Sequence, residues 1–352
     1  MAGNFDIRAW LRKPERLLVV SGPCSVESER QLLETAEGLS KIKNVNVLRG
    51  GIWKPRTRPD VFEGVGEVGL EWMREAKERF GFLTMTEVAT PEHVELALKH
   101  GIDILWVGAR TVVNPFSVQE LAASLKGNDI PVFVKNPIAP DVRLWLGAIE
   151  RLESAGLRHL GAIHRGFSSY DETPYRNAPL WEIPIELNRL RPDIPILTDI
   201  SHICGCRELL HDTAQKALDL ATNGFMIESH CNPDAALTDG RQQVTPDDLN
   251  ALVSQFVVRL KNTDSDEWKL NVFRKEIDRL DDEILNLISK RMEVSEKIGA
   301  YKKEHGVTVL QMDRWKQVLD DHINKGVRLG LSAEAVKDIF EAIHKESISR
   351  QL

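Results

Sequence analysis

Residues 44–58 read NVNVLRGGIWKPRTR, in which an apolar run ends at Leu48 and is followed by glycines, a proline and basic side chains. Residues 49–58 contain four cations, although the chain as a whole carries a formal net charge of −7. The glycines allow the backbone to approach a ligand closely, and Pro55 fixes one turn. The segment therefore predicts a cradle for phosphate or carboxylate groups at the end of a strand, with a solvated basic loop as the alternative.

Short β-branched runs of the same kind recur along the first part of the chain. They lie at residues 17–24, 45–50, 82–88, 104–110, 132–135, 159–165, 196–201 and 225–230. Each run is followed by enough chain for a crossover helix, and such alternation is typical of a parallel sheet. Eight such units predict a closed (β/α)8 TIM barrel, with a doubly wound open sheet as the alternative.

The composition excludes several classes of protein. Hydrophobic residues make up 42% of the 352 positions. Because no stretch approaches about 18 consecutive apolar residues, we expect a buried core and no membrane span. The N-terminal residues lack the basic and apolar regions of a signal peptide, which favours a cytoplasmic location. Overall acidity without a basic face argues against nucleic acid as a partner.

The composition changes sharply near residue 262. All 16 prolines precede Asp247, whereas residues 270–352 contain none and have the pattern of long, charged, amphipathic helices. Residues 261–267 are polar and resemble a linker. We therefore predict a barrel domain over 1–262, a linker over 263–268 and a small all-helical domain over 269–352.

Reactive side chains cluster at the predicted carboxyl ends of the strands, where the active sites of (β/α)8 barrels lie. Strand by strand they are Cys24, the basic run, Glu87, Arg110, Lys135, His164 with Arg165, His202 and Glu228. Cys24, His202, Glu228 and the nearby Asp239 could together hold one divalent transition ion, namely manganese, iron, cobalt or zinc. Alternatively, Cys204, Cys206, Cys231 and a histidine hold a structural zinc, or the cysteines are buried thiols without a chemical role.

The tail contains an apolar seam at alternating spacings of four and three, which is typical of a packed helix. It runs through Phe273, Ile277, Leu280, Ile284, Leu287, Val294, Ile298 and Tyr301. Arg291 interrupts the seam, and Lys302 lies eleven residues further on nearly the same face, so the pair could hold a compact dianion. A helical dimerisation arm with solvated charges is the alternative.

Several motifs of the first part are similar to those of the metal-dependent 3-deoxy-D-arabino-heptulosonate 7-phosphate synthases. In order they are Ser21-Gly-Pro-Cys24-Ser, Arg49-Gly-Gly, Lys54-Pro-Arg-Thr57, Gly108-Ala-Arg110, Val134-Lys135, His164-Arg165-Gly, Asp199-Ile-Ser-His202 and Glu228-Ser-His230. The match covers roughly residues 17–260 and looks most like the compact subgroup. One departure is Ile200, where many members have proline, and there we expect an altered turn without loss of a ligand.

This resemblance implies the first step of the shikimate pathway, the condensation of phosphoenolpyruvate with erythrose 4-phosphate. It places the metal on Cys24, His202, Glu228 and Asp239. It places phosphoenolpyruvate on Arg49, Lys54, Arg110, Lys135 and Arg165, and erythrose 4-phosphate beside Lys54, Arg56 and Thr57. Glu87 and His164 would be proton-transfer groups or hydrogen-bonding neighbours of the site.

Residues 268–352 resemble the all-helical chorismate mutases, which rearrange chorismate to prephenate. The matching motifs are Phe273-Arg274, Lys290-Arg291, Ala300-Tyr-Lys302, Asp313-Arg314 and Glu346-Ser-Ile-Ser-Arg-Gln351. The resemblance implies that Arg274 and Arg291 bind the two carboxylates, supported by Arg314 and Ser347. Lys302 and Gln351 would donate to the ether oxygen as its bond breaks. Gln311 and Trp315 stand where the family commonly has acidic residues.

Together these features predict a fused enzyme with two activities in aromatic amino acid biosynthesis. The mutase-like tail implies at least a homodimer, and prephenate is the expected feedback inhibitor. Two alternatives keep the synthase activity alone. In one, the helical domain is a sensor that binds chorismate or prephenate, and in the other it is purely structural.

Overall fold

The computed structural model describes residues 5–14, 16–54, 62–170, 172–258 and 267–351. Its contacts divide the chain into two compact units, residues 1–259 and 260–352. The linker predicted at 263–268 lies largely outside the described residues. Its last two positions belong to the helix α12, Glu267–Glu304.

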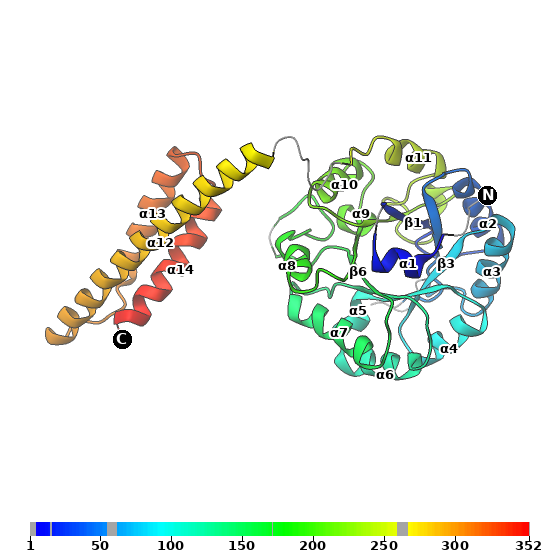
Figure 1. Ribbon diagram of the computed structural model, residues 1–352, viewed down its shortest axis with the longest axis horizontal. Coiled ribbons are helices and arrows are strands. Elements are labelled where there is room, and N and C mark those ends of the chain that lie inside the picture. The colour runs from blue at the N-terminus through cyan, green and yellow to red at the C-terminus, as the bar shows by residue number, and fades with distance from the viewer. Residues whose placement is uncertain (1–4, 15, 55–61, 171, 259–266, 352) are drawn as a thin grey trace. The chain divides into compact units, whose positions relative to one another are not determined.

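Eight parallel strands close into a barrel in chain order, which confirms the predicted fold (Figure 1). They are β1 Leu18–Gly22, β2 Val45–Arg49, β3 Leu83–Val88, β4 Ile104–Val107, β5 Val132–Lys135, β6 Leu160–His164, β7 Ile196–Asp199 and β8 Gly224–Glu228. Strand β1 pairs with both β2 and β8, and this pairing closes the ring. The doubly wound open sheet is therefore excluded.

Helices surround the barrel and connect its strands. They are α2 Glu29–Ser40, α3 Val68–Phe80, α4 Pro91–Lys99, α5 Ala109–Val112, α6 Pro115–Leu125, α7 Val142–Ser154, α8 Glu182–Leu190, α9 Ile200–Cys204, α10 Leu210–Asp219 and α11 Pro246–Ser254, with a short 3-10 helix at Pro233–Ala235. Ser28 and Thr90 accept hydrogen bonds from the first turns of α2 and α4, and proline begins α4. These are favourable helix starts, since free N–H groups gain an acceptor and proline has no N–H to lose.

Alternation along the strands separates two apolar cores, because successive side chains of a strand point to opposite faces. On β5, Val132 and Val134 pack against the surrounding helices, whereas Phe133 fills the barrel interior. Helix α1, Ile7–Arg12, adds Trp10 and Leu11 to the interior cluster. In Figure 1 this helix crosses the ring of strands. It covers the end opposite the carboxyl ends of the strands, so the open mouth is left to polar side chains.

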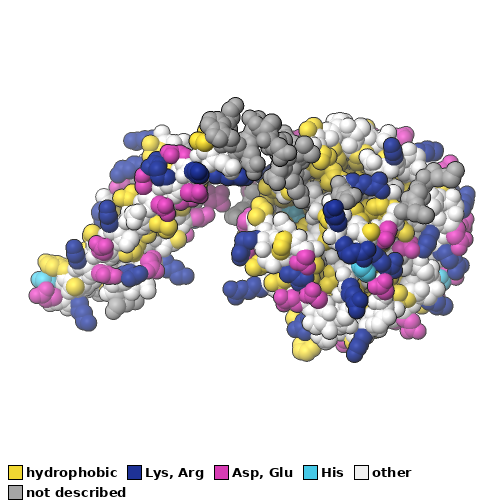
Figure 2. All heavy atoms as spheres, in the orientation of Figure 1, with side chains coloured by type: hydrophobic (Ala, Val, Ile, Leu, Met, Phe, Trp, Pro, Cys, Tyr) yellow, Lys and Arg dark blue, Asp and Glu magenta, His cyan; other side chains and the backbone are white. Residues whose placement is uncertain are grey.

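The second unit consists of α12, α13 Met312–Arg328 and α14 Ala333–Gln351. Gly299 lets α14 approach, since an added Cβ would lie 2.7 Å from the Gln351 Cα. The predicted apolar seam of α12 is exposed in one chain, with Phe273 and Leu287 each 65% accessible. Figure 2 shows hydrophobic side chains at the surface of this unit between charged ones. The seam therefore does not pack within the three-helix unit.

None of the helices in the described ranges combines the length and apolarity needed to cross a membrane.

Candidate active site

The last inward-facing positions of the strands carry charged side chains to the mouth of the barrel. On five of the strands such a residue lies two positions beyond an interior residue, as Arg49 follows Val47 and Lys135 follows Phe133. The set comprises Arg49 on β2, Glu87 on β3, Lys135 on β5, Asp199 on β7 and Glu228 on β8. The strand register therefore gathers both signs of charge around one opening.

Arg49 and Glu228 form a buried ion pair, with Nη1 3.1 Å from Oε1 and side chains that are 1% and 0% exposed. Burial alone would lower the pKa of Arg49, but Glu228 raises it above its ordinary value. Removing one partner of such a pair costs about 3–5 kcal/mol because the other charge stays buried. Arg49 also donates through Nη2 to the Cys24 carbonyl at 3.2 Å. This cation is therefore held rigidly at the barrel mouth.

Lys135 and His202 share Asp199, the first residue of the Asp199-Ile-Ser-His202 motif, to which the sequence assigned no role. Lys135 Nζ donates to Asp199 Oδ2 at 2.9 Å, and His202 Nδ1 lies 2.9 Å from the same oxygen. Burial alone would raise the pKa of Asp199, yet His202 and Lys135 hold it well below its usual range. The carboxylate also caps α9 by accepting from the His202 N–H. Asp199 therefore fixes both a cation and the backbone that carries His202.

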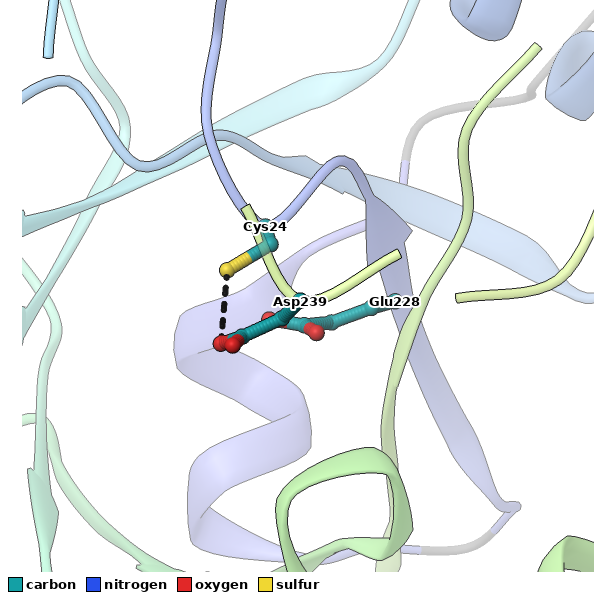
Figure 3. Close-up of side chains that lie close together, drawn as sticks. All are labelled: Cys24, Glu228 and Asp239. Atoms are coloured by element: carbon teal, nitrogen blue, oxygen red, sulfur yellow. Dashed lines mark hydrogen bonds between the residues drawn. The ribbon is translucent and has the colours of Figure 1, made fainter. Parts of the chain in front are cut away.

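The side chains of Cys24, Glu228 and Asp239 lie close together (Figure 3). Their sulfur and carboxylate oxygens lie within 4.8 Å of one another. Cys24 Sγ donates to Asp239 Oδ2 at 3.4 Å, and Glu228 Oε1 accepts no hydrogen bond from the described residues. Asp239 has φ +50°, a left-handed conformation that asparagine and aspartate tolerate best. Such a donor set and spacing fit a divalent transition ion.

The electrostatics of this cluster also favour a cation. Burial and the Glu228 charge raise the pKa of Cys24 to about 12, so the thiol is neutral until a cation displaces its proton. Burial would raise the pKa of Asp239, but Arg176 and His202 lower it to about 2. The cluster thus offers two ionised carboxylates and a thiol that can deprotonate on metal binding.

His202 lies beside the cluster without joining it. Its Nδ1 is 3.7 Å from Glu228 Oε1. Burial lowers the pKa of His202, which favours the neutral ring that metal binding requires. Three of the four residues assigned to the metal by resemblance therefore lie together, and the fourth is their neighbour. Ile200 begins α9, and the altered turn expected there stays a prediction.

Lys54 reaches the cluster from the basic segment, with Nζ donating to Cys24 Sγ at 3.2 Å. Gly51 makes room for it, since an added Cβ would lie 2.3 Å from the Cys24 carbonyl oxygen and 2.6 Å from Lys54 Nζ. Arg56 and Thr57, which the resemblance assigned to erythrose 4-phosphate, lie outside the described residues. The expected anion cradle is thus supported at Arg49 and Lys54 only.

Two more cations predicted from the sequence belong to the strand ends. Arg165 follows β6, and its Nη1 donates to Asn177 Oδ1 at 2.7 Å. Burial lowers the pKa of Arg165 to about 10, and the positive charges of Arg176 and Arg110 act in the same direction. Arg110, in α5, is exposed. Its guanidinium is therefore accessible to an anion from solvent.

Arg176 and Gln242 support the metal candidates, but sequence reasoning missed both. Arg176 Nη1 lies 3.0 Å from Asp239 Oδ1 and donates to Gln242 Oε1 at 2.7 Å. Gln242 Nε2 donates to Glu228 Oε2 at 2.7 Å. One chain of contacts thus orients the carboxylates of Glu228 and Asp239. Neither residue belongs to one of the sequence motifs, so it is the fold that brings them to the site.

His164 does not join the mouth. Its neighbour Ile163 fills the barrel interior, so alternation turns His164 outward toward the surrounding helices. There its Nε2 donates to the Pro179 carbonyl at 2.7 Å, and its ring meets Trp181 edge-on. Burial lowers the pKa of His164 to about 4, so the ring is neutral near pH 7. These contacts are those of a packed side chain between β6 and α8.

The remaining cysteines offer no support for a structural zinc. Cys204 is buried and its Sγ lies 3.2 Å from Thr213 Oγ1, while Cys231 lies beside Thr35. All four cysteines are free thiols. Among the described residues, the ligand grouping with metal spacing is the one that contains Cys24.

In the helical unit, polar side chains of α12 and α14 meet in two places. Arg291 Nη1 donates to Ser347 Oγ, which also lies 2.9 Å from Ser295 Oγ. Lys302 Nζ donates to Gln351 Oε1 at 3.2 Å and to the Val309 carbonyl at 2.7 Å. Four of the residues that the resemblance assigns to chorismate, Arg291, Lys302, Ser347 and Gln351, therefore meet between α12 and α14.

The other expected chorismate residues lie apart from these pairs. Arg274 and Arg314 are exposed, and among the described residues their hydrogen bonds are to near neighbours, Asn271 and Gln317. Trp315 stacks on His344, with ring centroids 3.7 Å apart and planes 5° from parallel. Burial, Arg291 and Lys302 lower the pKa of His344, which places this ring near the cations. One of the two positions where the resemblance implies an acidic residue is thus occupied by an aromatic ring that stacks on His344.

The fold and these contacts define a class: a (β/α)8 enzyme that gathers cations and metal-type ligands at its strand ends, joined to a helical unit with a separate cationic site. The chain belongs to the DAHP synthetase I family, whose model matches residues 11–262. Residues 273–352 match the chorismate mutase type II family. The protein thus combines a synthase domain of the shikimate pathway with a mutase domain.

Relatives agree with this assignment for the barrel. The chain is 32% identical to the phospho-2-dehydro-3-deoxyheptonate aldolase of Thermotoga maritima, over 68% of each chain. A crystal structure of that synthase aligns with a TM-score of 0.61 at 30% identity and again covers 68% of each chain. The 2-dehydro-3-deoxyphosphooctonate aldolase of Protochlamydia amoebophila is 27% identical over 69% of this chain and 90% of its own.

Proposed function

We propose that the barrel condenses phosphoenolpyruvate with erythrose 4-phosphate at the strand ends, with one divalent transition ion held by Cys24, Glu228, Asp239 and His202. The observation that carries this proposal is the contact of the ligand cluster with the buried cations, since Arg49 pairs with Glu228 and Lys54 contacts Cys24. A metal-type site and an anion site thus share one opening. The condensation requires both.

The cations of the site would hold phosphoenolpyruvate, a small trianion. Arg49 is suited to a planar, bidentate grip on a carboxylate or phosphate, and Lys135 supplies a point charge. Arg165 and Arg110 would add charge nearer the solvent. Because these groups are fixed before the substrate arrives, they stabilise the charge on the departing phosphate with little reorganisation.

The second substrate would bind between Lys54 and the cluster. When bound, the metal ion would supply Lewis-acid polarisation of the sugar aldehyde. Lys54 is placed to neutralise charge near that carbonyl, and Arg56 and Thr57 are proposed to hold the sugar phosphate. Glu87, at the mouth on β3, is the remaining proton-transfer candidate. The outward position of His164 leaves it a packing role.

The number of carbons in the sugar phosphate substrate tests this proposal. The matching relatives include enzymes named for a seven-carbon product and enzymes named for an eight-carbon product. A seven-carbon product requires a four-carbon aldose phosphate, and an eight-carbon product requires a five-carbon one. We expect kcat/KM to be at least about a hundredfold higher with erythrose 4-phosphate than with arabinose 5-phosphate. Coupled release of inorganic phosphate measures both rates, and equal or reversed values would refute the assignment.

For the helical unit we propose chorismate mutase chemistry by binding alone. Arg291 and Ser347 would hold one carboxylate, while Lys302 and Gln351 would donate to the ether oxygen, where hydrogen bonds strengthen as charge develops. Arg274 lies seventeen residues before Arg291, so it would reach a site from a second copy. Arg314 would support the second carboxylate, and the ring pair of Trp315 and His344 would adjoin the substrate hydroxyl.

The exposed seam of α12 supports a homodimer. An apolar face of this length is unfavourable in water, and a second copy of the same seam is its natural complement. We expect the protein to sediment as a dimer or larger at micromolar concentration, and an Ile284→Asp variant to dissociate and lose mutase activity. Leu329→Asp, at an exposed apolar residue outside the seam, is the matched control. A monomeric wild-type protein would contradict the proposal.

We further propose that prephenate bound in the helical unit lowers the rate of the barrel. The residues proposed for the condensation all belong to the barrel, which leaves the helical unit free for a regulatory role. Condensation rates at increasing prephenate should fall for the wild-type protein and stay constant for Arg291→Ala. A wild-type rate that is indifferent to prephenate, tyrosine and phenylalanine would exclude this feedback.

A further inference from the structure

Trp106 lies on β4 at an inward position and is completely buried. It contacts three of the charged residues at the mouth, although no motif includes it. We infer that Trp106 is a positioning residue for the condensation: its ring face fixes the cations Arg49 and Lys135, and its ring edge fixes the carboxylate Glu87. This inference rests on the proposed role of these cations in binding phosphoenolpyruvate.

The face of the indole serves two cations from different strands. The Arg49 guanidinium lies 5.0 Å from the ring centroid and Lys135 Nζ lies 5.5 Å from it. Both cations are buried, with Arg49 1% and Lys135 4% exposed. Buried cation–π contacts are stronger than exposed ones because no water competes for the charge. The ring therefore attracts two cations of like charge that come from different strands.

Anionic partners hold the same cations from another direction. Arg49 pairs with Glu228, and Lys135 pairs with Asp199. Each cation is thus fixed by a carboxylate and by the indole face, which leaves its remaining donors for a ligand. Arg49 Nε is buried and donates to none of the described residues. A buried donor without an acceptor is costly, so this N–H is suited to an incoming carboxylate or phosphate oxygen.

The edge of the indole orients Glu87. Trp106 Nε1 donates to Glu87 Oε2 at 2.8 Å. The other oxygen, Oε1, packs against Gly108, where an added Cβ would lie 2.1 Å away. Glu87 is therefore restrained on both sides, by an N–H donor and by a backbone without a side chain. Its position relative to the mouth depends on the indole.

A pure packing role predicts different behaviour. Phe133 fills the same interior cluster from the neighbouring strand β5 and is also completely buried. It has no cation over its ring among the described residues. Loss of volume at Phe133 should lower stability without changing KM for phosphoenolpyruvate. Loss of the aromatic face at Trp106 should raise that KM.

Four variants of the full-length protein test the inference: Trp106→Phe, Trp106→Leu, Phe133→Leu and Lys135→Met. Trp106→Leu removes the ring, and we expect KM for phosphoenolpyruvate to rise about tenfold, equivalent to about 1.4 kcal/mol, with KM for the sugar phosphate changed less than threefold. Trp106→Phe keeps an aromatic face but removes the donor to Glu87. It should retain KM within about threefold and lower kcat.

Phe133→Leu should lower the melting temperature and leave KM for phosphoenolpyruvate unchanged. The inference fails if Trp106→Leu leaves that KM unchanged, or if Phe133→Leu raises it equally. If Trp106→Leu does not fold, Trp106→Phe decides. A kcat and a KM for phosphoenolpyruvate that both equal the wild-type values in that variant would refute the inference. Lys135→Met separates the inference about Trp106 from the proposed function on which it rests. An unchanged KM for phosphoenolpyruvate in that variant refutes the proposed substrate site itself.

Discussion

Replacing Cys24 with alanine is expected to lower the condensation rate at least about a thousandfold and to release the metal ion. Cys24 supplies the sulfur of the ligand cluster, and Lys54 contacts the same atom. Loss of Lewis-acid stabilisation removes several kcal/mol from the transition state, which is a factor of this order. Metal content by atomic emission and phosphate release, measured on one preparation, check both parts.

Cys204→Ala is the matched control for this variant. Cys204 is also a buried thiol, but its contact is Thr213 and it lies outside the cluster. We expect it to keep its metal and its rate, with at most a loss of stability. Chorismate conversion should be unchanged in both variants, since the helical unit contains no ligand of the cluster. Full metal loading and full rate in Cys24→Ala would overturn the site.

The second large effect is expected at the other site. Gln351→Ala should lower kcat for chorismate rearrangement by about 10²–10³, the usual cost of removing one donor aimed at developing charge. Gln351 contacts Lys302 through its side-chain oxygen, so the variant also frees Lys302 to shift. Condensation should remain at the wild-type rate. The absorbance of chorismate followed over time provides the measurement.

Arg350→Ala is the control for Gln351, because it is the neighbouring position on the same helix. Arg350 pairs on the surface with Glu296 and Glu346, and such exposed pairs contribute little. Mutase activity should survive its loss. If the wild-type protein shows no turnover above background but binds prephenate, the helical unit is a sensor and the mutase proposal is wrong. If it shows neither, the unit is structural.

The barrel could be predicted from sequence because its signals are local. Apolar runs of strand length separated by helical stretches define eight units, and side chains such as Arg49 and Glu228 follow directly from the strand ends. The expected proximity of Cys24 and Glu228 follows from the meeting of the strand ends, whereas Asp239, which lies in the loop beyond β8, is assigned to the group by resemblance. These features depend on period and order, which a single sequence contains.

Other features depend on register and on loops, which the sequence does not specify. His164 and Arg165 are adjacent, and alternation allows only one of them to face the interior; the pairing of β6 with its neighbours decides in favour of Arg165. Arg176 comes to Asp239 from an irregular segment. Trp106 reads as a core residue until its neighbours are known. Sequence patterns cannot assign such contacts.

In the helical unit, the sequence leaves the packing undetermined for a different reason. The spacing of Ile284 and Leu287 predicts an apolar face on the helix, but within one chain this face is exposed. An apolar repeat with alternating spacings of three and four indicates that a helix face must be covered. It does not indicate whether the same chain or a second copy covers that face. Arg274 has the same ambiguity, since it lies far along α12 from Arg291.

One measurement tests the central claim most directly, namely that this chain contains a metal-dependent synthase site and a separate metal-independent mutase site. Both reactions are assayed on the same full-length protein after removal of divalent ions with a chelator. The account predicts that condensation is lost and is restored by a divalent transition ion, while chorismate rearrangement proceeds at the same rate throughout. Condensation at full rate in the chelated protein, or a mutase rate that falls and recovers with the metal, would contradict it.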